Sequence, residues 1–252
     1  MKLYLLVLIG GILLISAISV ELSSALDSFA MNEYQFVSSS ATINSNNKND
    51  DIEQLNRLQI CCSWSAKLSD GVLKYSIDTM EEESRDAIAN AIEEWNSKLD
   101  GLQLTEEKGD PAAADIRIVL GELADGQTGN RYYEFRNRID KDLTLVPSAG
   151  WTQFTFSKEG FIEGTKIIIS KDVIRQDFDK KIIEQIAKHE LGHALGLGHA
   201  NFEESLMADL IIEGRTPTIS ECEINGIYTA NSWKFVDSKQ NPEHIQRPFI
   251  SC

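Results

Sequence analysis

Residues 189–199 read His189-Glu190-Leu191-Gly192-His193-Ala194-Leu195-Gly196-Leu197-Gly198-His199 and hold three of the four histidines in the chain. On an α-helix, His189 and His193 lie one turn apart, roughly 40° from each other in projection, so both imidazoles can reach one cation. A continued helix would turn His199 roughly 240° away from His193. The helix therefore has to break, and Gly196 suits the break because a glycine adopts a left-handed backbone conformation without a Cβ clash.

Three neutral imidazoles that leave a fourth position open are typical of a catalytic zinc ion rather than a closed structural one. Glu190 directly follows the first histidine, so its carboxylate can lie beside the water that the metal activates and act as a general base. A purely structural zinc clamp is the alternative, but such a site would recruit a fourth protein ligand and would not need Glu190.

The run from His189 to His199 matches the pattern H-E-x-x-H-x-x-G-x-x-H, which resembles the metzincin clan of zinc endopeptidases. It is most similar to the matrixin, or matrix metalloproteinase-like, branch of that clan. The resemblance implies one catalytic zinc held by the three histidines, with Glu190 as the catalytic residue. It also implies that Met207, in Ser205-Leu206-Met207, forms the tight methionine turn beneath the metal.

The resemblance covers about 64–228 and implies an α/β (α+β) fold, the zincin catalytic domain of the metzincins. Such a domain has a twisted, mixed five-stranded sheet with an antiparallel edge strand, two long helices and a C-terminal helix. Periodicity predicts strands at 73–77, 102–104, 115–120, 151–156 and 165–170.

Capping signals predict where three helices begin. Thr79 and Glu82 form a capping-box pattern before a long helix that Gly101 closes, and Ser220 and Glu223 form another before a short helix to about Tyr228. The histidine-bearing helix should run from about 178 to 195, capped by Asp177 or Asp179. The Gly-rich stretch 121–149 is expected to be a loop.

The strand Trp151-Thr152-Gln153-Phe154-Thr155-Phe156 lies where matrixin-like folds have their antiparallel edge strand. An exposed edge offers main-chain groups that can hold an extended substrate across the metal. The other interpretation is a core strand with three aromatic side chains inside.

The N-terminus predicts export. Lys2 is followed by residues 3–20 without a single charge, which indicates a cleaved signal peptide or a retained membrane anchor. We expect residues 1–25 to be this signal or anchor, 26–60 a polar, disordered linker or propeptide-like segment, 61–232 the peptidase domain and 233–252 a tail. The protein would then be secreted, or anchored at the outer face of the membrane by residues 3–20.

Four cysteines agree with an oxidising compartment. The neighbours Cys61 and Cys62 are poorly placed to bridge each other, so we expect each to pair with Cys222 or Cys252, in an order that the spacing leaves open. A zinc site made of these cysteines is the alternative, although no C-x-x-C spacing supports it.

The amino-acid composition limits the classes of partner that the chain can bind. A hydrophobic content of 42% excludes disorder over the whole chain, and 39 acidic against 24 basic residues disfavour nucleic acid. We expect a monomer that acts on proteins or peptides. Calcium is a second candidate cofactor, in the acidic loop 121–142. The sequence thus predicts a zinc endopeptidase, with a non-proteolytic zinc-containing surface binding or adhesion module on the same fold as the alternative.

Overall fold

The computed structural model describes residues 55–121, 133–135, 144–146, 149–171, 180–209, 216–237, 241–245 and 247–252, all within one compact unit, Ile52–Cys252. The predicted signal or anchor, most of the predicted linker, and the candidate caps Asp177 and Asp179 lie outside these residues. Among the residues described, no helix combines the length and the apolar character that crossing a membrane requires.

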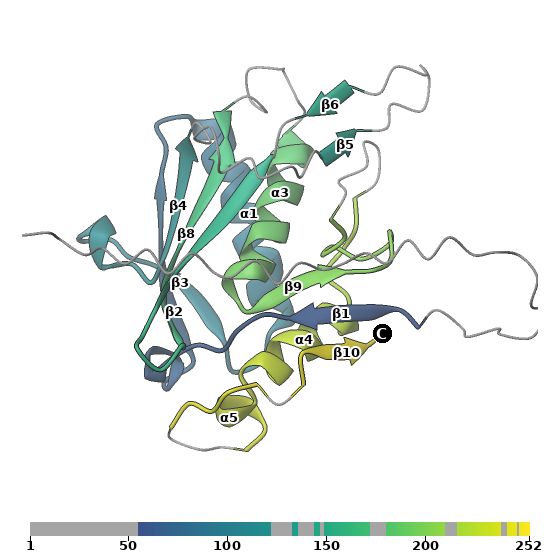
Figure 1. Cartoon of the computed structure of the whole chain (residues 1–252). Coiled ribbons are helices and arrows are strands. Elements are labelled where there is room, and N and C mark those ends of the chain that lie inside the picture. Colours follow the sequence, from purple (N-terminus) through teal and green to yellow (C-terminus); the bar gives the residue numbers. More distant parts are fainter. Residues whose placement is uncertain are drawn as a thin grey trace, which may run out of the picture. The chain divides into compact units, whose positions relative to one another are not determined.

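A five-stranded sheet forms one layer of the unit (Figure 1). Its strands lie in the order β3-β2-β4-β8-β7; the first four are parallel, and β7 pairs antiparallel with β8 at the edge. The mixed sheet with an antiparallel edge strand is therefore confirmed. The strands are β2 (Val72–Asp78), β3 (Gln103–Glu106), β4 (Ile116–Gly121), β7 (Gly150–Phe156) and β8 (Ile162–Ser170).

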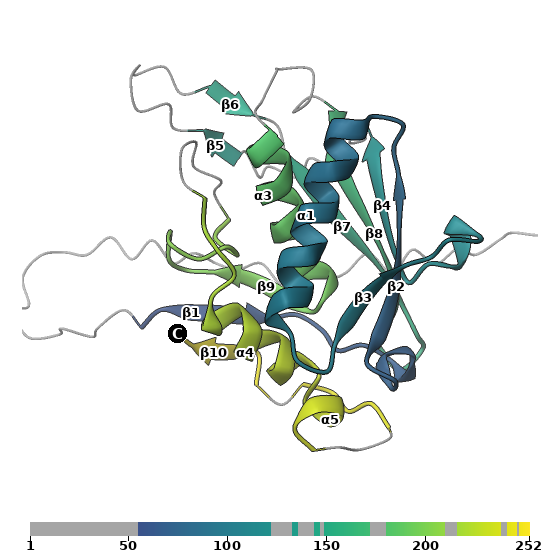
Figure 2. The ribbon, with the colours of Figure 1, turned by 180° about the vertical axis from the view of Figure 1, so that it is seen from behind.

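Two long helices, α1 (Glu82–Lys98) and α3 (Lys180–Ala194), lie side by side on one face of this sheet, as the opposite views of Figures 1 and 2 show. Their apolar residues recur at helical spacing, so each helix buries one stripe against the sheet and the other helix. Trp95 of α1 is fully buried, and its Nε1 donates to the carbonyl of Lys188 on α3 at 3.1 Å. This packing fixes the position of α3, the histidine-bearing helix, against α1 and the sheet.

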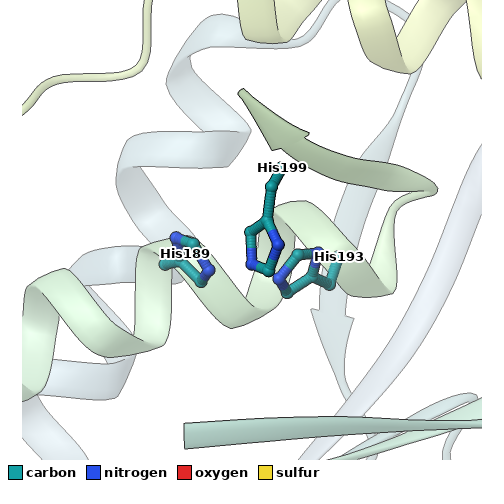
Figure 3. Close-up of side chains that lie close together, drawn as sticks. All are labelled: His189, His193 and His199. Atoms are coloured by element: carbon teal, nitrogen blue, oxygen red, sulfur yellow. The ribbon is translucent and has the colours of Figure 1, made fainter. Parts of the chain in front are cut away.

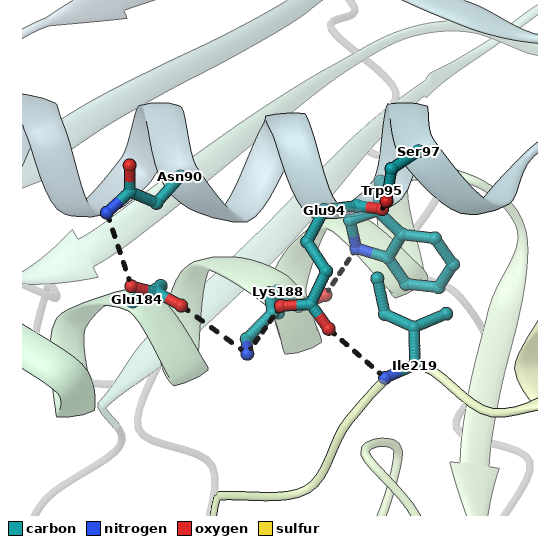
Figure 4. Close-up of polar contacts among 7 residues, drawn as sticks. All are labelled: Asn90, Glu94, Trp95, Ser97, Glu184, Lys188 and Ile219. Atoms are coloured by element: carbon teal, nitrogen blue, oxygen red, sulfur yellow. Dashed lines mark hydrogen bonds and ion pairs between the residues drawn. The ribbon is translucent and has the colours of Figure 1, made fainter.

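Polar groups add a second connection between α1 and α3 (Figure 4). The Lys188 ammonium, on a side chain that is 8% exposed, lies 2.9 Å from Glu94 Oε2 and 3.6 Å from Glu184 Oε1. The other Glu94 oxygen, Oε1, accepts a hydrogen bond from the Ile219 N–H at 3.5 Å. Lys188 thus connects α3 to α1, and Glu94 connects α1 to the segment that leads into the next helix.

The predicted capping box at the start of α1 is wrong. The N-cap is Glu81, and Thr79 Oγ1 accepts from the Glu81 N–H at 3.1 Å instead of from a helical N–H. Glu81 in turn accepts a hydrogen bond from the Ser84 hydroxyl. The helix begins two residues later than the Thr79 pattern predicts, and the N-cap Glu81 makes no side-chain hydrogen bond to a helical N–H. At α4 (Glu221–Ala230), by contrast, the capping box of Ser220 and Glu223 is present.

Residues outside the predicted domain limits are also folded. Strand β1 (Arg57–Ile60) lies between β9 (Leu197–Ala200) and β10 (Phe249–Ser251) in a three-stranded antiparallel sheet. Leu58 and Ile60 are almost completely buried, so these residues of the predicted linker belong to the core. The predicted tail contains β10 and all but the first residue of the short helix α5 (Ser232–Phe235).

The predicted loop 121–149 contains two short strands. Strands β5 (Tyr133–Phe135) and β6 (Thr144–Val146) pair antiparallel as a separate two-stranded sheet. Three-residue strands leave too short an alternation to be recognised in a sequence. Two single-turn 3₁₀ helices, Ala66–Leu68 and Pro111–Ala113, complete the elements described.

The predicted disulfide pairing is wrong. Cys61 bonds to its neighbour Cys62, and Cys222 bonds to Cys252. The reason is the register of β10 against β1: the Cys252 N–H donates to the Asn56 carbonyl, which puts Cys252 at the end of β1 opposite to Cys61. Cys222, in the first turn of α4, is the cysteine within reach of that end.

Candidate metal centre and active site

The third histidine returns to the first two because the chain turns after α3. The helix ends at Ala194, and Gly196 has a positive φ of 107°. A Cβ on Gly196 would lie 2.3 Å from the Cys62 carbonyl oxygen, and the Gly196 carbonyl accepts from the Cys61 N–H at 2.9 Å. The position therefore requires glycine both for its conformation and for this close approach. The chain then continues as β9, which carries His199.

Three imidazoles converge at this point (Figure 3). His189 and His193 extend from α3 and His199 from β9, and the potential ligand atoms of all three lie within 4.8 Å of one another. The ring centroids are 4.7 Å apart for His189 and His193, and 4.8 Å apart for His193 and His199. Within the described part of the chain, this is the group of residues whose spacing could hold a metal ion.

Backbone carbonyls fix which nitrogen of two histidines faces the centre. Nδ1 of His189 lies 2.8 Å from the Leu206 carbonyl oxygen, and Nδ1 of His193 lies 2.9 Å from that of Leu197. A carbonyl only accepts, so each Nδ1 carries the proton and each Nε2 keeps its lone pair for a cation.

The Nε2 atom of His189 supplies an independent test of the fit to a metal. It is buried and has no hydrogen-bond partner in the described residues. Burial also lowers the pKa of His189, which keeps the ring neutral. A buried lone pair without a hydrogen-bond donor suits a metal, and three imidazole nitrogens are a donor set that suits zinc.

Glu190 is held on the edge strand of the main sheet. Its side chain is 2% exposed, and its Oε2 accepts from the Thr152 hydroxyl of β7 at 2.7 Å. A Cβ on Gly150 would lie 2.6 Å from the other oxygen, Oε1, so the carboxyl group rests directly on Gly150. Burial raises the pKa of Glu190 to about 7, although the hydrogen bond from Thr152 opposes that rise.

Met207 packs under the histidine-bearing helix. It is fully buried, and a Cβ on Gly192 would lie 2.4 Å from its sulfur, so Gly192 leaves the space that the thioether fills. The Met207 carbonyl accepts from the Ala200 N–H, and its N–H donates to Ser205 Oγ. The Ser205 hydroxyl in turn donates to buried Glu223 of α4 at 2.6 Å. The turn that contains Met207 also supplies the carbonyl that orients His189 through Leu206.

The structure brings together the residues that the sequence singled out at the centre, and it adds contacts that the sequence did not indicate. The contacts of Gly150 and Thr152 with Glu190 join segments about 40 positions apart, and no local signal could have predicted them. The cysteines lie outside the cluster, although the backbone of Cys61 and Cys62 contacts Gly196. The candidate calcium loop 121–142 lies almost entirely outside the described residues.

Comparisons with known proteins agree with this geometry. Residues 63–230 match the family model of the matrixins, peptidase family M10. The chain is also 28% identical to human matrix metalloproteinase-19 over 136 residues, which are 53% of this chain and 23% of that protein. The chain thus spans about a quarter of the length of this relative. The family match covers two thirds of the chain, and matrixins are endopeptidases that use a catalytic zinc; this chain belongs to the matrixin family.

Proposed function

We propose that this protein is a zinc-dependent endopeptidase that acts on proteins or peptides outside the cytoplasm. The observation that carries the proposal is the convergence of three imidazoles next to a buried glutamate that follows the first of them. Two disulfides among the described residues support an oxidising compartment. The uncharged run 3–20 supports export, by a cleaved signal or a retained anchor.

His189, His193 and His199 would hold the zinc through their centre-facing nitrogens. Zinc, when bound in such a site, activates water for attack and polarises the scissile carbonyl. The carbonyls of Leu206 and Leu197 keep the imidazoles of His189 and His193 in one tautomer and one orientation. Met207 would support the same two imidazoles from beneath α3.

Glu190 would move the proton. Its carboxylate would accept a proton from the attacking water and then deliver it to the leaving amine. A pKa of about 7 in the metal-free protein suits a group that must both accept and release a proton near neutral pH.

The edge strand β7 would align the substrate. The Ser170 N–H donates to the Ala149 carbonyl, so these two residues face each other as a hydrogen-bonded pair of the antiparallel ladder. Counting along the register, the backbone groups of Trp151 and Gln153 then point to β8, and those of Thr152 and Phe154 point to the opposite edge of β7. An extended peptide could pair with these outward groups.

The test of the proposed function is hydrolysis of casein or a quenched peptide by the full chain, with and without chelator. We expect activity that chelator removes and zinc restores. In Glu190→Gln, zinc content should stay at the wild-type value while turnover falls below a few per cent, because an amide cannot accept the proton. A zinc-loaded wild-type chain that cuts nothing would instead support the non-proteolytic binding module.

The edge-strand role has its own test, the comparison of Phe154→Pro with Phe154→Ala. Both variants lose the ring, but only proline also loses the outward N–H. We expect kcat/KM on a long peptide to fall further in the proline variant, at unchanged zinc content. Equal values for two folded variants would show that substrate does not pair at this position.

A further inference from the structure

The hydroxyl of Thr152 lies between two groups of Glu190. Thr152 Oγ1 is 2.7 Å from the Glu190 carboxylate oxygen Oε2 and 3.1 Å from the Glu190 main-chain carbonyl oxygen. A single side chain on β7 therefore contacts both the side chain and the backbone of the residue next to the first histidine.

A second residue of β7, Gly150, also contacts Glu190, and we call Gly150 and Thr152 together the seat of Glu190. A Cβ on Gly150 would lie 2.6 Å from Oε1, 2.8 Å from Cγ and 2.9 Å from Cδ of Glu190, well inside contact distance. Gly150 thus leaves room for the carboxyl group, while Thr152, two residues further along the same face of the strand, binds one of its oxygens.

This seat is rigid. Thr152 is opposite Ile167 and Gly150 is opposite Ile169, and both of these β8 residues are fully buried. Thr152 is also β-branched, which restricts its χ1 angle. A buried carboxyl group with one oxygen bound to such a hydroxyl has little freedom to rotate.

The fold itself does not require the hydroxyl at position 152. Valine has the same shape and an equally high preference for strands, so it would fill the position and leave the pairing with β8 intact. What valine would remove is the hydrogen bond from the Thr152 hydroxyl to Oε2.

We propose that Thr152 is a positioning residue, which together with Gly150 holds the Glu190 carboxylate in the orientation from which it transfers protons. This inference rests on the proposed function, since it assigns Thr152 a role in the peptidase reaction. Thr152 acts through Glu190 and is not itself a catalytic residue.

The kinetic test compares Thr152→Val with Thr152→Ser and with Thr105→Val, the same substitution on β3 at the opposite edge of the sheet. We expect Thr152→Val to lower kcat by ~10- to 100-fold at a nearly unchanged KM, because a misplaced reacting group costs rate rather than binding. Thr152→Ser should restore most of kcat, and Thr105→Val should match the wild type. Zinc content should be equal in all three. A Thr152→Val enzyme with wild-type kcat would overturn the proposal.

A second variant covers the case in which Thr152→Val does not fold. Gly150→Ala keeps the hydroxyl but places a Cβ against Glu190 Oε1, and the φ of Gly150 lies outside the positive range that disfavours alanine. We expect the same selective loss of kcat. Wild-type kcat in Gly150→Ala would show that Glu190 does not need this seat.

A double-mutant cycle on zinc-free protein separates this inference from the proposed function. Thr152→Val should lower the Tm of the wild type by more than it lowers the Tm of Glu190→Ala, in which the main-chain carbonyl of residue 190 is the one of these two partners that remains. Equal Tm losses in both backgrounds would overturn the proposal. If the wild type cuts no peptide, the proposed function fails, and this cycle alone decides whether Thr152 holds Glu190.

Discussion

At the scale of single residues, burial shifts the proton equilibria of two neighbours in opposite directions. It raises the pKa of Glu190 to about 7 and lowers that of His189, so that both groups favour their neutral forms. Both groups therefore make the stability of the metal-free protein depend on pH, with opposite signs.

The first prediction concerns Glu190→Gln in chelator. The folded-state pKa of Glu190 is raised above its ordinary value of 4.5, so its stabilising contribution is full below pH 4.5 and is lost as the pH rises through about 7. The free energy of unfolding of the variant, relative to that of the wild type, should therefore rise by up to about 3 kcal/mol from pH 5 to pH 8. Urea unfolding at both pH values measures this.

Comparing Glu190→Gln with the wild type at each pH cancels the contribution of His189 to the pH dependence of stability. Its pKa is lowered, so its stabilising contribution is present above 6.5 and is lost as the pH falls, equally in variant and wild type. A difference between the proteins that does not change with pH would contradict the raised pKa of Glu190.

Gly196→Ala is the second prediction. The substitution should destabilise the protein by about 2–4 kcal/mol and weaken zinc binding. The reasons are the φ of 107° and the distance of 2.3 Å from a new Cβ to the Cys62 carbonyl oxygen. Gly160→Ala is the matched control. Its φ is 85°, but the nearest atom lies 3.5 Å away, so it should cost about 1 kcal/mol. Equal losses of stability would mean that the backbone conformation alone, and not the close approach to Cys62, requires glycine at position 196.

At the scale of elements, one lysine between α1 and α3 has most of its side chain buried. Lys188 is 8% exposed, and it meets the carboxylates of Glu94 and Glu184, each 25% exposed. Two acidic groups so close to each other need the ammonium between them.

The third prediction is therefore that Lys188→Met destabilises the protein by about 1–3 kcal/mol, although methionine retains the apolar part of the side chain. Lys180→Met, which removes an exposed pair with Asp86 on the same two helices, should cost less than about 0.5 kcal/mol. Denaturant unfolding of both variants measures the difference. Equal costs would assign no stabilising role to the buried contact.

Elements with local signals could be predicted from the sequence. The five strands of the main sheet, the two long helices and the turn at Gly196 were expected because periodicity, a helix-breaking glycine and the spacing of histidines are local properties. Strand β1 was missed because Arg57–Ile60 has only four residues and is buried by partners about 140 and 190 positions away. The seat of Glu190 on Gly150 and Thr152 was missed for the same reason, since only the folded chain brings these residues together.

The disulfides show the limit of spacing arguments. Cys61 and Cys62 were expected to reach distant partners because neighbours bridge rarely. The antiparallel register that places Cys252 beside Asn56 could not be derived without knowing that β1 and β10 are strands.

At the scale of the whole molecule, the Cys222–Cys252 bond ties α4 to the sheet that carries His199. β10 makes contact with β1, and β1 with β9, so a single bond secures the outer strand of this sheet.

The fourth prediction is that Cys222→Ser/Cys252→Ser lowers the free energy of unfolding by about 3–4 kcal/mol, as expected for a bond that closes a loop of 30 residues. Peptide mapping of the exported wild type under non-reducing conditions should find Cys222 linked to Cys252, and Cys61 linked to Cys62. Any peptide that links Cys61 or Cys62 to Cys222 or Cys252 would contradict the pairing.

The central position of β1 also governs the order in which a growing chain can complete its metal centre. Arg57 leaves the ribosome 144 positions before Asn201, its partner beyond the end of β9, which is a delay of roughly 7–29 s at ordinary rates of synthesis. Until then Leu58 and Ile60 stay exposed on an unpaired strand, which is the kind of surface that chaperones protect. The helix with His189 and His193 can form earlier, but His199 is held only once β9 has paired with β1. The nascent protein therefore acquires its third imidazole only after β9 has left the ribosome, and zinc loading should begin no earlier than that.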